Sequence, residues 1–185
     1  MLVPLTAEEE AFLRAFARAT LTVPRAFDAD LLREQRMSLS EYTALMHLSE
    51  APGRRLRMSD LASASALSLS GMTRIVNRLE GQGLVHRERS GSDGRGWNAV
   101  LTDAGLERLR QAWPTHLASV RLHVFDHLNH VDVPAFATAL QRFAADTRYA
   151  EVERERDFPE ADPAPVRPAR GMADRLRGPA ASAER

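Results

Sequence analysis

Residues 68–80 read SLSGMTRIVNRLE and separate two kinds of side chain onto two sides of one helix. At about 100° per residue, the apolar side chains gather on one side. The other side carries small, hydrogen-bonding and basic residues: Ser70, Gly71, Thr73, Arg74, Asn77 and Arg78. A solvated helix face normally mixes charges of both signs, yet no acid appears here before Glu80. The pattern predicts a surface that approaches an anion closely.

These residue types match the chemistry of duplex DNA. Asparagine can pair with adenine, arginine with guanine or phosphate, and threonine with a base edge or a thymine methyl. Small residues at the helix start allow close approach of a phosphate, which the positive end of the helix dipole favours. We predict a helix that enters the major groove, with Ser68 as its N-cap. The predicted DNA-binding residues of this helix are Ser68, Ser70, Gly71, Thr73, Arg74, Asn77 and Arg78.

Positive charge is concentrated around this helix, although the whole chain is neutral, with 25 basic and 25 acidic residues. Residues 54–95 hold 8 arginines and 4 acids, a net charge of +4, whereas residues 1–53 carry −3 and residues 96–185 carry −1. Local field matters more than total charge for a nucleic-acid partner. The distribution therefore supports DNA as the partner.

Several classes of function are disfavoured. The absence of cysteine excludes disulfides and thiolate metal sites. The sequence offers no nucleophile with a plausible base, no phosphate-binding glycine loop and no paired carboxylates, so we predict neither an enzyme nor a cofactor. No signal peptide or membrane-spanning run is recognisable, and we expect a cytoplasmic protein.

The elements around residues 68–80 complete a mainly α-helical domain with a small β-wing. Residues 6–35 form a helical pattern that Pro24 should break or kink near residues 22–25. A capping box, Ser38 with Glu41, starts a helix that runs to about Glu50, and Ser59 caps a short helix. Extended runs at 84–89 and 97–101 predict a hairpin. A short helix, a turn, a second helix and a hairpin make a winged helix-turn-helix.

Two further helices are expected after the hairpin. Thr102 caps a long one over residues 103–130, and Asp132 with Pro134 starts another that runs to about Tyr149. The predicted division is 1–36 for an N-terminal helical part of a dimerisation region, 37–102 for the DNA-binding domain, 103–156 for C-terminal dimerisation helices, and 157–185 for a disordered tail.

The sequence resembles the DNA-binding core of MarR-family transcriptional regulators over roughly residues 5–148. The most specific motifs are VNRLEGQGLV at 76–85, the Asp-x-Arg pair Asp93 and Arg95, and VLTDAG at 100–105. The resemblance implies that Arg95 at the wing tip reaches the minor groove or adjacent phosphates, with Asp93 orienting it. Further phosphate contacts are predicted for basic residues on and near the wing: Arg54, Arg55, Arg57, Arg87 and Arg89.

A homodimer is expected because the long helix carries an apolar stripe that one chain covers only in part. Two recognition helices about 34 Å apart would also match a pseudo-palindromic operator. Family members are similar homodimers built from their terminal helices. The predicted interface residues are Phe12, Phe16, Trp113, Leu117, Val120, Val124 and Leu128.

The resemblance further implies a repressor that a small aromatic or lipophilic ligand releases from DNA. The ligand would bind between the dimerisation helices and the winged helix, near Phe27, Tyr42, Met46, Trp113 and His116. Two alternatives remain. One is a winged-helix protein–protein interaction module without an operator. The other is a metal-responsive regulator that uses His116, His123, His127 and His130, whose spacings place them near one helical face.

Overall fold

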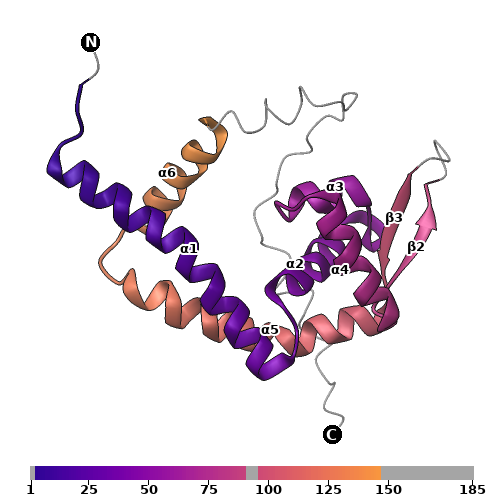
Figure 1. Cartoon of the computed structure of the whole chain (residues 1–185). Coiled ribbons are helices and arrows are strands. Elements are labelled where there is room, and N and C mark those ends of the chain that lie inside the picture. Colours follow the sequence, from indigo (N-terminus) through magenta and orange to yellow (C-terminus); the bar gives the residue numbers. More distant parts are fainter. Residues whose placement is uncertain (1–2, 91–95, 147–185) are drawn as a thin grey trace, which may run out of the picture.

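Two lobes share the long helix α5 (Figure 1). The computed structural model describes residues 3–90 and 96–146. In one lobe, α1 (Ala7–Gln35) lies along α5 (Asp103–His123), and the N-terminal half of α1 meets α6 (Val133–Asp146). Phe16 of α1 and Phe143 of α6 make this contact, with ring centroids 6.0 Å apart. The lobe is an arm of helices rather than a closed bundle.

The other lobe is the winged helix-turn-helix. It begins with α2 (Leu39–Glu50), the 3₁₀ turn η1 (Pro52–Arg54) and the short strand β1 (Arg55–Arg57). The helices α3 (Met58–Ala64) and α4 (Leu69–Gly81) follow, and the strands β2 (Val85–Arg89) and β3 (Trp97–Leu101) form the wing. The antiparallel sheet has the order β1-β3-β2, with Arg89 opposite Trp97 and Val85 opposite Leu101. Thus the predicted winged-helix order and the predicted hairpin strands are confirmed.

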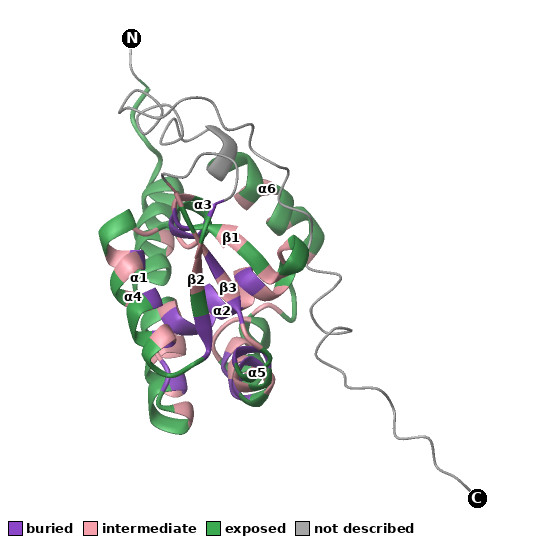
Figure 2. Ribbon diagram, turned by 90° about the vertical axis from the view of Figure 1, so that its right-hand side faces the viewer, coloured by how far each residue is buried: buried purple, intermediate pink, exposed green. Residues whose placement is uncertain are grey.

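The buried core belongs mainly to the winged-helix lobe and to the part of α5 that supports it. Figure 2 shows buried residues where α2, α4, the sheet and α5 meet, while α6 and most of α1 are exposed. Tyr42, Leu45 and Leu48 of α2 are fully buried. So are Met72, Val76 and Leu79 of α4. Since α1 contributes only Leu31 as a buried residue, most of the described arm's apolar surface is left uncovered.

Local capping chemistry places most of the helix starts. The Ser38 and Glu41 capping box is present, Ser68 Oγ accepts from Gly71 N at 3.2 Å, and Thr102 Oγ1 accepts from Gly105 N at 3.0 Å. These contacts satisfy backbone donors that the first turn of a helix leaves free. The predicted short helix α3 is present, but the prediction of Ser59 as its N-cap was wrong. The helix begins at Met58, and its N-cap Arg57 makes no side-chain bond.

Two predictions about the long helices also need correction. α1 continues through Pro24, so the break predicted near residues 22–25 is excluded, while the alternative of a kink stays a prediction. The helix contacts α6 through Phe16 and packs along α5. α5 ends at His123 rather than near 130, because Val124 leaves helical geometry and a 3₁₀ turn, η2 (Phe125–His127), follows. Asn129 fixes this turn by donating to the Asp126 carbonyl at 3.0 Å.

The start of α6 agrees with the sequence, since Asp132 Oδ1 accepts from Ala135 N at 3.0 Å. The predicted tail at 157–185 and the wing-tip residues Asp93 and Arg95 lie outside the described residues. Across the described ranges, no helix has the length and apolar character needed to cross a bilayer.

A close backbone approach joins the two lobes at Gly105, in the first turn of α5. A Cβ atom there would lie 2.1 Å from the Leu84 carbonyl oxygen and 2.6 Å from Leu101 Cδ1. Thr102 Oγ1 reinforces the approach by donating to the Gly83 carbonyl at 2.8 Å. Only glycine fits without moving α5 away from the wing.

We therefore expect Gly105→Ala to lower the free energy of unfolding by at least about 1–3 kcal/mol, as overpacked sites do. Urea denaturation measures this change. The matched control is Gly81→Ala, because a Cβ at Gly81 meets nothing within 4 Å. That variant should gain up to about 1 kcal/mol from helix propensity. Equal stability of the two variants would contradict the packing argument.

Candidate nucleic-acid interface

The helix α4 presents its polar side to solvent. Its apolar side is buried through Met72, Val76 and Leu79, and this contact fixes the rotation of the helix. Arg74 and Asn77 are exposed, and neither makes a side-chain hydrogen bond or ion pair with any residue in the described ranges. Leu69 departs from the predicted apolar side, because it is 49 % exposed at the start of the helix.

The N-terminal residues of α4 are organised by bonds within the helix. Ser68 Oγ lies 3.2 Å from Ser70 Oγ as well as from Gly71 N. A Cβ at Gly71 would lie 3.2 Å from Ser68 Oγ, which is tighter than ordinary contact. Thr73 Oγ1 donates to the Leu69 carbonyl at 2.8 Å. These residues first stabilise the helix start, and they also leave it free of bulky side chains.

Arg78 is held by a buried acid that the sequence did not single out for this role. Its Nη1 lies 3.3 Å from Glu41 Oε1, and the Glu41 side chain is only 6 % exposed. The other Glu41 oxygen accepts from Ser38 N at 2.8 Å and from Ser38 Oγ at 3.0 Å. One carboxylate therefore caps α2 and also orients an arginine of α4. Arg78 itself stays 63 % exposed.

Most basic residues around the wing are paired in the same way. Arg87 Nη2 lies 2.6 Å from Glu80 Oε2, and Arg87 N also donates to Glu80. Hydrogen bonds from Arg87 hold the pKa of Glu80 below its ordinary value. Arg55 pairs with Glu88 at 2.7 Å, and Arg54 pairs with Asp103 at 2.8 Å. The Arg55 contact similarly lowers the pKa of Glu88.

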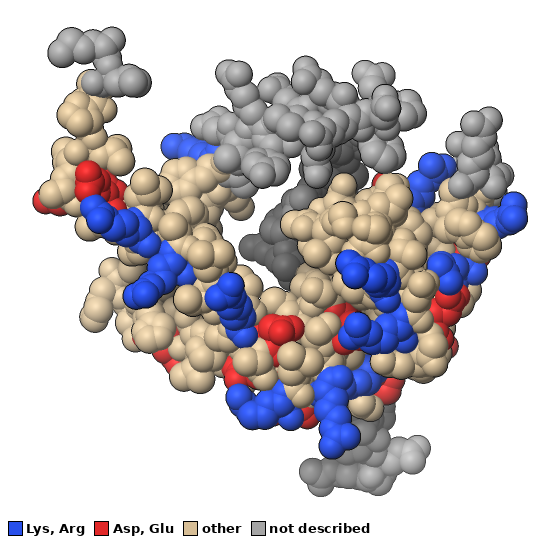
Figure 3. Space-filling view, in the orientation of Figure 1, with Lys and Arg blue, Asp and Glu red and all other residues tan. Residues whose placement is uncertain are grey.

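Arg89 is different, because its described partner is an aromatic ring. The guanidinium carbon lies 5.5 Å from the centroid of Trp97. Trp97 was not among the predicted site residues. Its exposed position at the start of β3 cannot be seen from strand alternation alone. Figure 3 shows basic side chains over the winged-helix lobe as well as along α1.

Four of the five predicted effector residues lie in one cluster between α1, α2 and α5. The His116 ring is the centre, with centroids 4.4 Å from Tyr42, 5.6 Å from Phe27 and 6.4 Å from Trp113. Met46 is partly buried against the neighbouring core. An open crevice of about 420 Å³ lies elsewhere on α1, and none of the five residues lines it. Its lining residues are Pro24, Arg25, Asp28, Ala29, Leu32, Leu39 and Ser40.

The cluster contains two buried polar atoms without a hydrogen-bond partner among the described residues, Tyr42 Oη and His116 Nδ1. Burial raises the pKa of Tyr42 well above its ordinary value and lowers the pKa of His116. Both groups are therefore neutral near pH 7. A buried polar atom without a partner costs free energy, so each of these two atoms could accept or donate a bond to a ligand.

The four histidines do not share one helical face, which removes the geometric basis of the metal-responsive alternative. His116 belongs to the aromatic cluster, and His123 Nε2 lies 3.0 Å from Asp30 Oδ2. His127 lies in η2, beyond the end of α5. Within the ranges described, no three His, Cys, Asp or Glu side chains gather as metal ligands would.

The predicted interface residues occupy different surroundings. Phe12 and Leu117 are 51 % and 42 % exposed, whereas Phe16 stacks on Phe12 with centroids 6.0 Å apart. Trp113 packs against the core of its own chain. Val120, Val124 and Leu128 are half-buried, but the last two lie beyond α5. Other exposed apolar residues of the arm were not predicted as interface residues: Leu13, Leu21, Leu122, Phe125, Val131 and Phe143.

Comparison with known proteins gives a consistent result. A family model described as "MarR family" matches residues 37–96. Transcriptional repressor MprA of Escherichia coli K12 is 31 % identical over 84 residues, which are 45 % of this chain and 48 % of MprA. The match thus spans about half the length of this curated relative.

Solved structures match over a longer range. AbsC, a MarR family transcriptional regulator from Streptomyces coelicolor, is 37 % identical, with a TM-score of 0.72 over 80 % of this chain and 99 % of AbsC. Sco3205 from the same organism, a MarR family transcriptional regulator solved in complex with DNA, is also 37 % identical. Its TM-score is 0.71 over 77 % of this chain and 90 % of Sco3205.

The buried cluster predicts a pH dependence of stability. Because burial lowers the pKa of His116, the unfolded chain binds a proton that the folded chain does not, and stability falls as pH drops through about 6.5. The lowered pKa of His47 acts in the same direction, whereas the lowered pKa of Asp30 acts only at more acidic pH.

We expect His116→Phe to lose less thermal stability than the wild type between about pH 7.5 and pH 5.5, because one titrating site is gone. Differential scanning calorimetry at both pH values gives the two differences in Tm. The control is His86→Gln, since His86 is exposed on β2. An undiminished loss in His116→Phe would show that the site does not contribute to the pH dependence.

Proposed function

The chain belongs to the MarR family of transcriptional regulators, and from this premise we propose that it is a homodimeric repressor of a pseudo-palindromic operator. A small aromatic or lipophilic effector releases it from DNA. The observation that carries the proposal is the exposed polar side of α4, where Arg74 and Asn77 have no partner within the described residues. Because the side chains of Arg74 and Asn77 make no hydrogen bond to the described part of the protein, they are available to bond with base edges.

DNA binding is supported by the position of α4 within the winged helix. The second helix of a helix-turn-helix lies in the major groove, with its polar side chains toward the bases. Arg78 is exposed and steadied by Glu41, which suits a contact to a phosphate or a guanine. The crystal structure of the relative Sco3205 contains DNA. The name of MprA supports repression as the outcome.

The homodimer is supported by the uncovered apolar side chains of the arm. Exposed leucines and phenylalanines occur on α1, on the C-terminal part of α5 and on α6. Apolar side chains exposed in this number are typical of a surface that another chain covers. A second copy of the chain covers this surface and supplies the second recognition helix. Two-fold symmetry then matches the two halves of the operator.

The effector site is supported by the cluster around His116. Its aromatic walls suit an aromatic or lipophilic compound, and Tyr42 Oη and His116 Nδ1 can hydrogen-bond to a polar group on it. Because the cluster joins α2 of the DNA-binding lobe to α1 and α5 of the arm, an effector inserted there changes the separation of the two recognition helices.

The experiment that tests the proposal is selection of binding sites from a random duplex pool, at about 0.15 M salt so that weak electrostatic binding is suppressed. An inverted repeat with half-sites about one helical turn apart supports a dimeric regulator. Absence of any enriched sequence, also after addition of cell extract to supply a co-ligand, contradicts the proposal.

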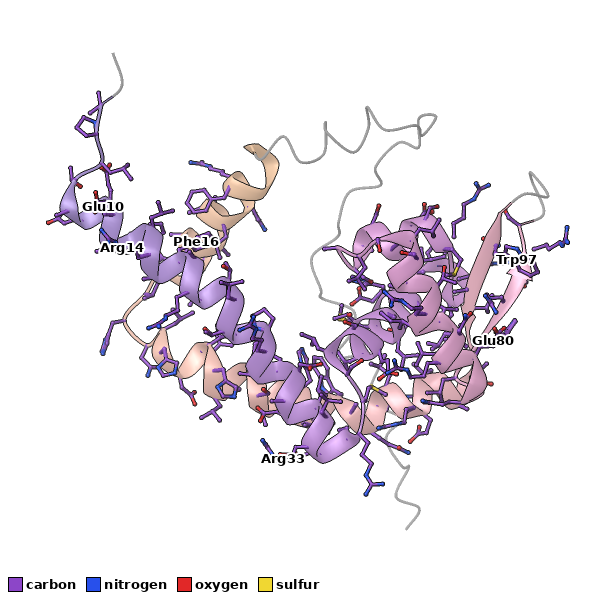
Figure 4. All side chains as sticks on the ribbon, viewed as in Figure 1. Glu10, Arg14, Phe16, Arg33, Glu80 and Trp97 are labelled. Atoms are coloured by element: carbon purple, nitrogen blue, oxygen red, sulfur yellow. The ribbon has the colours of Figure 1, made fainter. Side chains whose placement is uncertain are left out.

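Arg74→Ala and Asn77→Ala should each weaken operator binding by roughly 1–3 kcal/mol and relax preference at one position per half-site. The loss arises because a base edge is left without its bidentate partner. Fluorescence anisotropy on the operator and its single-base variants measures both effects. Arg14→Ala on α1, far from α4, is the control for the removal of one charge (Figure 4). An equal loss on every sequence would identify a phosphate contact instead.

Leu117→Glu should convert the dimer to a monomer, because it places a charge in an apolar interface. Light scattering coupled to size exclusion should report twice the single-chain mass of 20.6 kDa for the wild type and the single-chain mass for the variant. Leu69→Glu is the control, since Leu69 is similarly exposed but lies in the DNA-binding lobe. A monomeric wild type would refute the dimer.

A further inference from the structure

One side of the wing carries an aromatic–arginine pair that the proposed base contacts do not include. Arg89 ends β2 and Trp97 begins β3, and the two are directly opposite in the strand register. Residues opposite one another in an antiparallel pair share a face of the sheet. The pair is thus built by the hairpin itself and does not depend on the residues of its tip.

The strand register shows which way this face points. Along the same face lie Arg87 opposite Ala99 and Val85 opposite Leu101. Val85, Ala99 and Leu101 are buried, and Arg87 reaches Glu80 of α4 at 2.6 Å. Arg89 and Trp97 therefore continue the α4-facing side of the wing beyond the point where α4 covers it. Figure 4 places Trp97 farther along the wing than Glu80, toward its tip.

The charge of Arg89 is balanced differently from that of its neighbours. Arg55, Arg78 and Arg87 each have a carboxylate partner. Arg89 has no carboxylate partner among the residues that the structure describes, and its guanidinium lies over the Trp97 ring at 5.5 Å. A ring orients a guanidinium through cation–π attraction and leaves its N–H donors free. Such a group is ready to bind an anion.

Trp97 adds a second surface for the same ligand. Its side chain is 47 % exposed, although indole is among the groups that gain most from burial. Its N–H is a donor that can reach a phosphate oxygen, and its ring can cover the apolar face of a sugar. The DNA backbone beside the major groove has alternating sugars and phosphates. It can therefore bind the guanidinium of Arg89, the indole N–H of Trp97 and the exposed face of the indole ring.

We infer that Arg89 and Trp97 form a DNA-backbone clamp between the recognition helix and the wing. Arg89 binds a phosphate, and Trp97 packs on the adjacent deoxyribose while holding the guanidinium in place. This inference rests on the proposed function. The contact is sequence-independent, because neither group reaches a base edge. Trp97 acts as a positioning residue for Arg89 and as a contact in its own right.

The test uses the full-length chain and two duplexes, the selected operator and a scrambled sequence of equal length. Arg89→Ala and Trp97→Ala should each lower the affinity for both duplexes by a similar factor, about five- to twentyfold. Arg89→Ala should also reduce the slope of log K against log salt by about 0.9, the value for one lost phosphate contact. Arg14→Ala should leave affinity and slope unchanged.

A double-mutant comparison of DNA affinity tests whether Trp97 positions Arg89 or only contributes contact area to DNA. The variant that carries both Arg89→Ala and Trp97→Ala should bind DNA nearly as well as the single variant with the lower affinity, because removing the ring already misplaces the guanidinium. Trp97→Phe keeps an aromatic face and should recover part of the affinity. Additive losses together with no recovery in Trp97→Phe would overturn the positioning role.

Fluorescence gives a readout that a purely structural role of Trp97 would not change. The chain has two tryptophans, so the difference between wild type and Trp97→Phe reports Trp97 alone. Acrylamide quenching of that difference signal should fall at least about twofold when DNA saturates the protein, since a half-exposed ring becomes covered. Circular dichroism confirms that the variants are folded.

The outcomes separate this inference from the proposed function. If the wild type binds the operator but Trp97→Ala binds equally well and acrylamide access is unchanged by DNA, the clamp is wrong and the regulator stands. A loss confined to the operator would mean base recognition and would also overturn the clamp. If the wild type binds neither duplex, both the clamp and the proposed function fail.

Discussion

The contact of α5 with the wing at Gly105 is the constraint on which the arrangement of the two lobes depends. The backbone of the first α5 turn lies against the Leu84 carbonyl, so that a single methyl group would clash at 2.1 Å. The same helix contacts α1 fourteen residues later, where Ser119 Oγ donates to Asp30 Oδ2 at 2.6 Å. One rigid element thus fixes both the wing and the arm. Close-packed contacts of this kind transmit a displacement instead of absorbing it.

Within the DNA-binding lobe, carboxylates decide which arginines are available to a ligand. Glu41, Glu80 and Glu88 each hold one arginine of α4 or the sheet. Exposed ion pairs contribute little to stability, so the main effect of these pairs is to restrict where the guanidinium groups point. Arg74 and Arg89 have no such partner among the described residues. The described basic residues of this region thus include arginines held by a carboxylate, such as Arg55, Arg78 and Arg87, and two without such a partner, Arg74 and Arg89.

Elements whose signals lie within a few residues could be predicted from the sequence. Features that depend on contacts between residues far apart in the sequence could not. Ser38, Ser68 and Thr102 were recognisable as N-caps because the bond each makes lies within its own first turn. The pairing of Arg78 with Glu41 was not predictable, since 37 positions separate them. Nor was the end of α5, because the apolar stripe continues past His123 while the backbone turns. The exposure of Trp97 depends on how far α4 covers the wing, which no periodicity reports.

α2 lies between the aromatic cluster around His116 and the recognition helix α4, and it therefore offers a direct route by which the proposed effector would act on α4. Tyr42 of α2 lies against His116 of α5, with ring centroids 4.4 Å apart. The preceding residue, Glu41, holds Arg78 of the recognition helix. Adjacent residues of a helix point about 100° apart, so α2 touches the cluster on one side and α4 on the other. If a ligand separated Tyr42 from His116 by moving or rotating α2, Glu41 would be displaced with the helix. In the proposed dimer, the orientation of Arg78 and the spacing of the two recognition helices would then change together, without any change in the base contacts themselves.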